Sequence, residues 1–72
     1  MSKAEIAKIR NYAWDVWPWF DTAAIEDTVD ELVNNEYTTL DAVKQIKSDE
    51  HLELYGGKLP MRFRHLIIYN QQ

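Results

Sequence analysis

Two short signals near the C-terminus constrain the fold most strongly: the pair Gly56-Gly57 and, just after it, Leu59-Pro60. Glycine readily takes the left-handed backbone conformation that ends many helices, which a residue with a Cβ resists. Proline suits the first position of a helix, where its missing N–H is not needed. Because Ser48 and the two acids after it form a capped first turn, the segment predicts one helix from Ser48 to Gly56 and a last helix from Leu59 onward.

The N-terminal segment predicts a first helix that ends near Pro18. Ser2 and Glu5 have the spacing of a capping box, in which each side chain binds the backbone N–H of the other residue. Pro18 ends or kinks a helix because its ring clashes with the preceding turn. The apolar side of this helix repeats at helical spacing and comprises Ile6, Ile9, Tyr12, Ala13 and Val16.

Two shorter helices are predicted between this helix and Ser48. Asp21 can cap a second helix that ends near Asn34-Asn35, and Thr38 or Thr39 can cap a short third helix. Their inward-facing positions are Ile25, Val29, Leu32 and Val33 in the second helix, and Leu40, Val43 and Ile46 in the third.

The pattern as a whole predicts an all-α protein. No stretch alternates at period two, so residues 1–72 are expected to form a single helical domain, a compact bundle of four to five short helices. The last helix turns Leu59, Phe63, Leu66 and Ile67 inward and leaves Arg62, Arg64 and His65 towards water. The expected core includes Leu32, Val43, Leu52, Phe63 and Leu66.

Composition limits the classes of protein open to the chain. Its 72 residues are 46% hydrophobic, which allows a compact core, and the absence of cysteine excludes disulfides and thiolate metal sites. The apolar runs are far shorter than a membrane span, and the N-terminus lacks the apolar stretch of a secretory signal. We therefore expect an intracellular, cytoplasmic protein without a membrane span.

Charge is divided along the chain. Residues 1–14 carry three bases and one acid, residues 15–53 carry two bases and eleven acids, and residues 54–72 carry three bases and no acid. An acidic middle between basic ends disfavours nucleic acid as a partner, because contact with phosphates along a duplex requires a basic face.

No set of residues suggests catalysis or a cofactor. The two histidines, His51 and His65, lack the spacing of metal ligands. Ser2 and Ser48 are interpreted as helix caps without a neighbouring base, and the single glycine pair does not make a phosphate-binding loop. We therefore expect a protein that is not an enzyme and that holds no metal or cofactor.

Five of the nine aromatic residues lie between Tyr12 and Phe20. At helical spacing Val16 and either Trp19 or Phe20 enter the core, while Trp14 or Trp17 stays partly exposed. An exposed tryptophan favours a binding hot spot, and we assign Trp17 to the binding surface. Core packing of the same rings is the alternative.

From about residue 16 to residue 70 the order of these signals resembles a sterile alpha motif (SAM) domain, preceded by an additional N-terminal helix at residues 3–15. Pro18 and Gly57 depart from the family pattern. The matching positions are Val16, Trp19 and Phe20, then Leu32, Tyr37 and Leu40, then Ser48, Leu52, Tyr55 and Gly56, and finally Leu59, Pro60, Arg62, Arg64 and Leu66.

The resemblance implies a non-catalytic protein–protein interaction module, such as a signalling adaptor, that binds another domain of SAM type or a second copy of itself. Such domains often associate through an acidic mid-chain surface and the basic start of the last helix. The implied binding residues are Lys58, Arg62 and Arg64 on the basic side and Glu36, Asp41, Asp49, Glu50 and Glu53 on the acidic side.

Two other functions remain open from the sequence. One is a small nucleic-acid-binding regulator of helix-turn-helix type, with Arg62 and Arg64 on phosphates. The other is a small acidic inhibitor protein that presents residues 26–53 to a basic enzyme.

Overall fold

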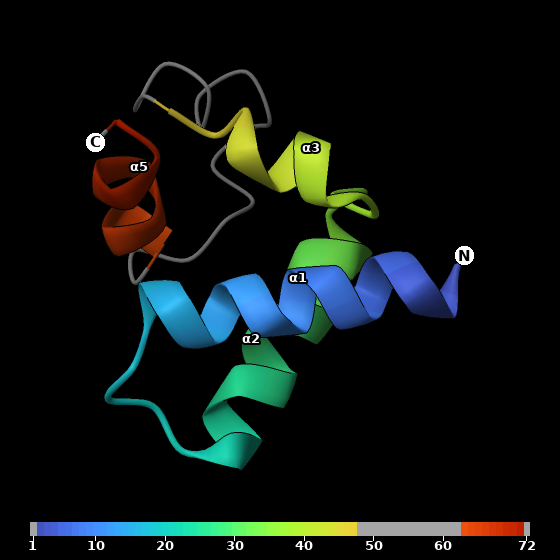
Figure 1. The fold of residues 1–72 in the computed structure, drawn as a ribbon, viewed down its shortest axis with the longest axis horizontal. Coiled ribbons are helices and arrows are strands. Elements are labelled where there is room, and N and C mark those ends of the chain that lie inside the picture. The colour runs from blue at the N-terminus through green and yellow to red at the C-terminus, as the bar shows by residue number, and fades with distance from the viewer. Residues whose placement is uncertain (1, 48–62, 72) are drawn as a thin grey trace.

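A computed structural model of the protein describes residues 2–47 and 63–71, and this part of the chain is helical (Figure 1). The helices are α1 (Lys3–Val16), α2 (Thr22–Asn34), α3 (Leu40–Lys44) and α5 (Arg64–Asn70). No strand occurs in these two ranges, which confirms the all-α class. The predicted helix stop at Gly56-Gly57 and helix start at Leu59-Pro60 lie outside the described residues.

α1 lies at the centre of this arrangement. It packs against α2, α3 and α5, so the N-terminal helix is an integral part of the bundle rather than an addition to it. The Arg10 side chain on α1 donates hydrogen bonds of 2.6 and 3.4 Å to the carboxylate of Glu26 on α2. The helix ends at Val16, just before Pro18, as the sequence predicts.

Side-chain caps begin three of the helices where the sequence places them. The Ser2 hydroxyl accepts a hydrogen bond from the backbone N–H of Glu5, which starts α1. Asp21 accepts from the N–H of Ala24 at 2.8 Å in the first turn of α2. Of the two threonines that could cap α3, Thr39 does so, by accepting from the N–H of Ala42.

The C-terminal end of α2 is a Schellman motif with an unusual residue in the left-handed position. The N–H of Tyr37 donates to the carbonyl of Leu32, and the N–H of Glu36 donates to the carbonyl of Val33. Glu36 takes a φ of 72°, a conformation that favours glycine. Tyr37 and Leu32 are both buried, which supplies the apolar contact typical of this motif.

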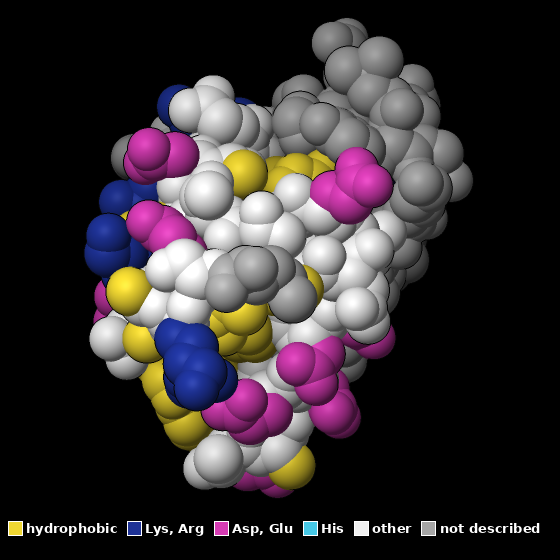
Figure 2. All heavy atoms as spheres, turned by 90° about the vertical axis from the view of Figure 1, so that its right-hand side faces the viewer, with side chains coloured by type: hydrophobic (Ala, Val, Ile, Leu, Met, Phe, Trp, Pro, Cys, Tyr) yellow, Lys and Arg dark blue, Asp and Glu magenta, His cyan; other side chains and the backbone are white. Residues whose placement is uncertain are grey.

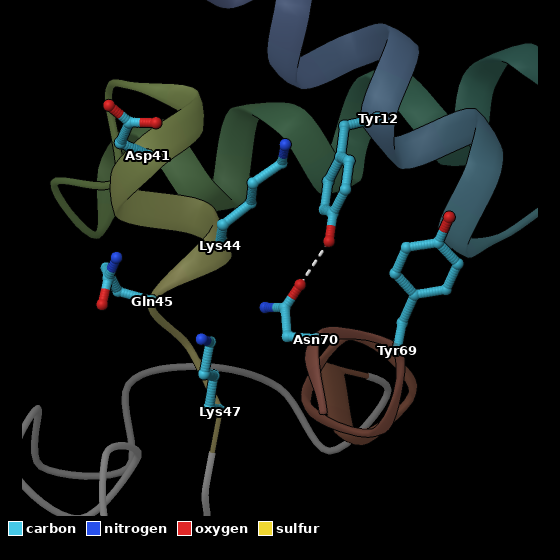
Figure 3. Close-up of a pocket in the computed structure, with 7 residues that line it drawn as sticks. All are labelled: Tyr12, Asp41, Lys44, Gln45, Lys47, Tyr69 and Asn70. Atoms are coloured by element: carbon cyan, nitrogen blue, oxygen red, sulfur yellow. Dashed lines mark hydrogen bonds between the residues drawn. The ribbon is translucent and has the colours of Figure 1, made fainter. Parts of the chain in front are cut away.

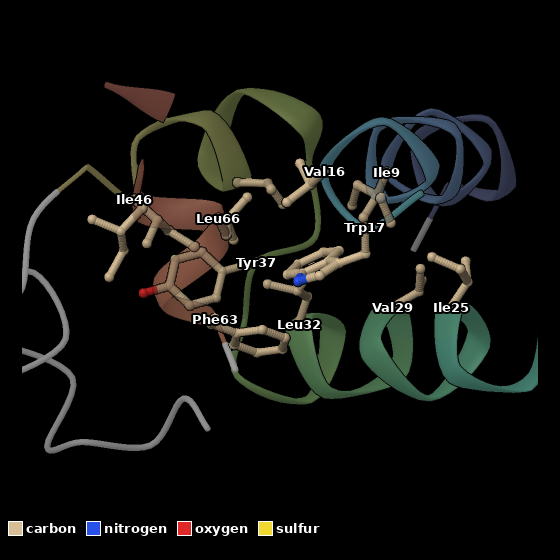
Figure 4. Packing of buried hydrophobic residues seen from close by; sticks show 13 residues of the cluster. Ile9, Val16, Trp17, Ile25, Val29, Leu32, Tyr37, Ile46, Phe63 and Leu66 are labelled. Atoms are coloured by element: carbon tan, nitrogen blue, oxygen red, sulfur yellow. The ribbon is translucent and has the colours of Figure 1, made fainter. Parts of the chain in front are cut away.

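The core joins side chains from all four helices and from the joints between them (Figure 4). Leu32, Val43, Phe63 and Leu66 are buried as predicted, whereas Leu52 lies outside the described residues. Among the described residues, the core comprises Ile9, Ala13, Val16, Trp17, Ile25, Val29, Leu32, Tyr37, Val43, Ile46, Phe63, Leu66 and Ile67.

Both ends of α3 are held by side chains from other helices. At its start, the Glu5 carboxylate on α1 accepts a hydrogen bond of 3.2 Å from the N–H of Leu40. At its end, the Asn70 amide on α5 donates to the carbonyls of Val43 and Ile46 at 3.0 and 2.7 Å and accepts from the Tyr12 hydroxyl on α1. A helix of five residues is too short to be stable alone, so these tertiary bonds are needed to hold it.

Replacement of Asn70 tests the bond at the end of α3. Asn70→Ala should lower the free energy of unfolding by about 1–3 kcal/mol, because the Ile46 carbonyl and the Tyr12 hydroxyl lose their partner and the Val43 carbonyl loses one of its two donors. Gln71→Ala, which removes an exposed bond to the Lys47 carbonyl, should change it by less than about 0.5 kcal/mol. Urea unfolding followed by tryptophan fluorescence measures both, and equal losses would contradict the role of Asn70.

The pH dependence of stability tests the bond at the start of α3. The hydrogen bond from the Leu40 N–H, with Lys8 nearby, lowers the pKa of Glu5 below its ordinary value of 4.5 despite partial burial. Because this pKa is lower in the folded chain than in the unfolded one, the stabilisation is present above the unfolded pKa and is lost as the pH falls through the folded pKa.

Glu5→Gln should therefore be less stable than the unmodified protein at pH 7, and the difference should shrink as the pH falls below 4.5. Lys8→Met should keep most of this pH dependence, because Leu40 is the larger cause. Urea midpoints of both proteins, measured at pH 7 and at lower pH, test this prediction. A difference between the two midpoints that stays constant over this pH range would show that the Glu5 carboxylate does not hold α3.

Candidate functional site

The structure describes three of the residues that the sequence assigns to a charged interface. Glu36 and Asp41 are exposed at the joint between α2 and α3, and Arg64 is exposed at the first position of α5. Neither carboxylate forms an ion pair with another described residue. The other predicted charged residues lie outside the described ranges, namely Lys58, Arg62, Asp49, Glu50 and Glu53.

The assignment of Trp17 to the binding surface is wrong. Its side chain is 1% exposed, and its ring stacks on Phe20 and contacts Phe63, with ring centres 5.7 and 5.6 Å apart. The prediction assumed helical spacing up to residue 20, but α1 ends at Val16 and the following turn directs Trp17 inward. A residue enclosed in the core cannot contact a partner directly.

The exposed rings of the aromatic segment are Trp14 and Trp19 instead. Trp14 matches the prediction, whereas Trp19, expected as a core residue in one alternative, is 62% exposed. The Trp19 ring meets His65 of α5 edge to face, with ring centres 5.3 Å apart. Trp19 therefore lies beside the first turn of α5.

A pocket of about 460 Å³ opens where α1, α3 and α5 meet (Figure 3). Residues from all three helices, and from the segment that follows α3, contribute side chains to it. The lining residues are Tyr12, Asp41, Lys44, Gln45, Lys47, Tyr69 and Asn70. The sequence analysis singled out only Asp41 among them as a binding residue, and no sequence pattern links Tyr12 with Asn70.

Aromatic and cationic groups face each other in this pocket. The Lys44 ammonium lies over the Tyr12 ring, 5.4 Å from its centre, and Tyr69 meets Tyr12 edge to face at 5.5 Å. Burial, with smaller effects from Tyr69 and Asp15, raises the pKa of Tyr12 above its ordinary value of 10.0. Tyr12 therefore keeps its proton at neutral pH and can donate its hydrogen bond to Asn70.

The described surface carries charges of both signs and no candidate metal site. Acidic and basic side chains lie close together on the face near the start of α1, with apolar atoms between them (Figure 2). Residues 2–47 and 63–71 contain no group of three or more acidic or histidine side chains arranged to hold a metal ion. Within the same ranges, no helix has the length and apolar character needed to cross a membrane.

Comparisons with protein-family models, with curated proteins and with solved structures give no significant match to the chain.

The different surroundings of two tryptophans lead to a stability prediction. Trp17→Ala should lower the free energy of unfolding by about 3–5 kcal/mol, because it leaves a large cavity in the core. Trp19→Ala, at an exposed position in the same segment, should change it by less than about 0.5 kcal/mol. Thermal unfolding followed by circular dichroism compares the two variants. A larger loss of stability in Trp19→Ala than in Trp17→Ala would show that Trp19, and not Trp17, is the core residue.

Proposed function

We propose that the chain is a non-catalytic protein–protein interaction module of SAM type. It associates through an acidic surface at the joint between α2 and α3 and a basic surface at the start of the last helix. Of the acidic residues expected to take part, the structure describes Glu36 and Asp41, and of the basic ones Arg64. The other expected residues lie outside the described ranges: Asp49, Glu50, Glu53, Lys58 and Arg62. The partner is another domain of this kind, including a second copy of the chain.

The observation that carries this proposal is the presence of glutamate at position 36. Its φ of 72° costs a residue with a Cβ roughly 1–2 kcal/mol, a cost that glycine would avoid. The Glu36 carboxylate is exposed and makes no hydrogen bond or ion pair with the described residues. The Glu36 backbone serves the Schellman motif, which glycine would serve at a lower cost, so what the glutamate side chain adds is an exposed negative charge, and a strained residue of this kind points to a role in function.

Two further features support the proposal. Asp41 is also exposed, five positions after Glu36, so the joint presents two carboxylates without ion-pair partners among the described residues. On the basic surface, Arg64 is followed in the sequence by His65, whose ring contacts the exposed Trp19 ring. Arginine and tryptophan are the residues most enriched in the energetic centres of protein interfaces.

Oppositely charged surfaces on one molecule form a head-to-tail contact. When each surface of a copy binds the other surface of the next, chains of molecules grow until one surface is blocked. Exposed ion pairs of this kind weaken with added salt, because charges are screened beyond about 8–10 Å at physiological ionic strength.

Replacement of Glu36 by glycine separates stability from association. Glu36→Gly should raise the free energy of unfolding by roughly 0.5–1 kcal/mol, because relief of strain exceeds the added backbone entropy of glycine. It should also weaken association by about two- to fivefold, the loss typical of one exposed ion pair. Urea unfolding and sedimentation velocity at low and high salt measure the two effects.

Charge reversal on each surface provides the matched test. Glu36→Lys and Arg64→Glu should each prevent growth beyond the monomer, while an equimolar mixture should form dimers through the one intact pair of surfaces. Asp30→Lys, an exposed position on α2 outside the acidic surface, should associate more strongly than Glu36→Lys. A protein that remains monomeric at all concentrations in low salt, or a mixture that forms no dimer, would contradict this mode of self-association.

A further inference from the structure

The pocket between α1, α3 and α5 has the size and the rigid framework of a ligand site. Its volume of about 460 Å³ lies within the range of small-molecule pockets, which occur preferentially between the helices of bundles. Asn70, at its base, uses both amide hydrogens and its oxygen in bonds to α3 and α1. The pocket is thereby held in shape by contacts that a ligand does not need to displace.

The pocket is lined by two lysines whose ammonium groups form no ion pair with a carboxylate of residues 2–47 or 63–71. Lys44 and Lys47 both line it, and no described carboxylate lies within 4.0 Å of either ammonium. A lysine near the end of a helix can bind the free carbonyls there, but Asn70 already occupies those of Val43 and Ile46. The Lys44 ammonium lies instead over the Tyr12 ring, on the side of that ring away from Tyr69 in Figure 3.

We propose that this pocket binds the phosphate group of a monoester whose organic part is a flat, apolar ring. The lining carries two positive charges against the single negative charge of Asp41, and a phosphate monoester carries about −1.5 to −2 at neutral pH. A carboxylate, with one charge, would leave one ammonium unpaired. Gln45 and Tyr69 also line the pocket and carry neutral groups that can donate hydrogen bonds.

The aromatic walls account for the ring in the ligand. A pocket of this volume has room for more than a phosphate group, and the partly exposed Tyr69 ring offers an apolar side wall. Aromatic pairs favour edge-to-face or offset contacts, such as the contact that Tyr69 already makes with Tyr12. The pocket shares Asp41 with the proposed acidic surface, but the inference does not use Glu36 or Arg64.

Titration with phenyl phosphate, followed by NMR of the labelled protein, tests the inference. Saturable shifts are expected for residues 44–47 and 69–70, with binding that strengthens as the pH rises from 5 to 7 and the phosphate loses its second proton, near a pKa of about 6. Lys47→Gln, at an exposed position, should weaken binding several-fold, and Lys44→Gln combined with Lys47→Gln by roughly tenfold or more. Lys3→Gln removes the same charge at the start of α1 and should leave binding unchanged.

Further probes separate the sources of the phosphate and the contribution of each group. Tighter binding of a capped phosphotyrosine amide than of phenyl phosphate would assign the site to a phosphorylated side chain, and the reverse order to a free phosphorylated molecule. Inorganic phosphate and benzoate should both bind more weakly than phenyl phosphate. Equal binding of benzoate, an equal loss in Lys3→Gln, or shifts that do not saturate would each overturn the proposed site.

Discussion

The attachment of α3 to α1 at both ends is the constraint on which the rest of the described structure depends. Five residues cannot form a stable helix in water, because the first turn alone costs more than one or two hydrogen bonds return. Glu5 supplies an acceptor at the start, and Asn70, itself bonded to Tyr12, supplies donors at the end. α1 thus sets the position of α3, and through it the walls of the pocket and the joint that carries Glu36.

The same arrangement explains why both candidate sites lie beside α3. One side of this short helix turns Val43 into the core, while its outer side carries Asp41 and Lys44 towards water. The Schellman motif before it closes α2 tightly, so the chain reaches Thr39 with only a few residues and with Glu36 forced into a left-handed conformation. The Schellman motif before α3 and the hydrogen bonds at both ends of α3 restrict the backbone that carries these charged groups. A restricted backbone loses little entropy when a partner binds.

Local signals in the sequence predicted local structure well. The caps at Ser2, Asp21 and Thr39 depend on side chains and N–H groups three residues apart, so spacing alone reveals them.

The spacing of residues in the sequence does not reveal tertiary contacts. Glu5 was expected to bind back to Ser2 as in a capping box, yet its carboxylate binds Leu40, 35 positions away. Trp17 was misplaced because helical periodicity was carried past the residue at which Pro18 ends the helix. The pocket was missed because Tyr12 and Asn70 stand 58 positions apart.

The bond between Tyr12 and Asn70 also determines the order in which folding can be completed. During synthesis the capped start of α1 and the whole of α2 can form while later residues are still being added. The carbonyls at the end of α3, however, lack the Asn70 amide until Asn70 has emerged and α5 has packed against α1, and until then Val43 has only the N–H of Ile46 as its donor. Closing a contact across most of the chain is slow compared with forming helices. A nascent chain therefore keeps an unfinished third helix until α5 has been synthesised.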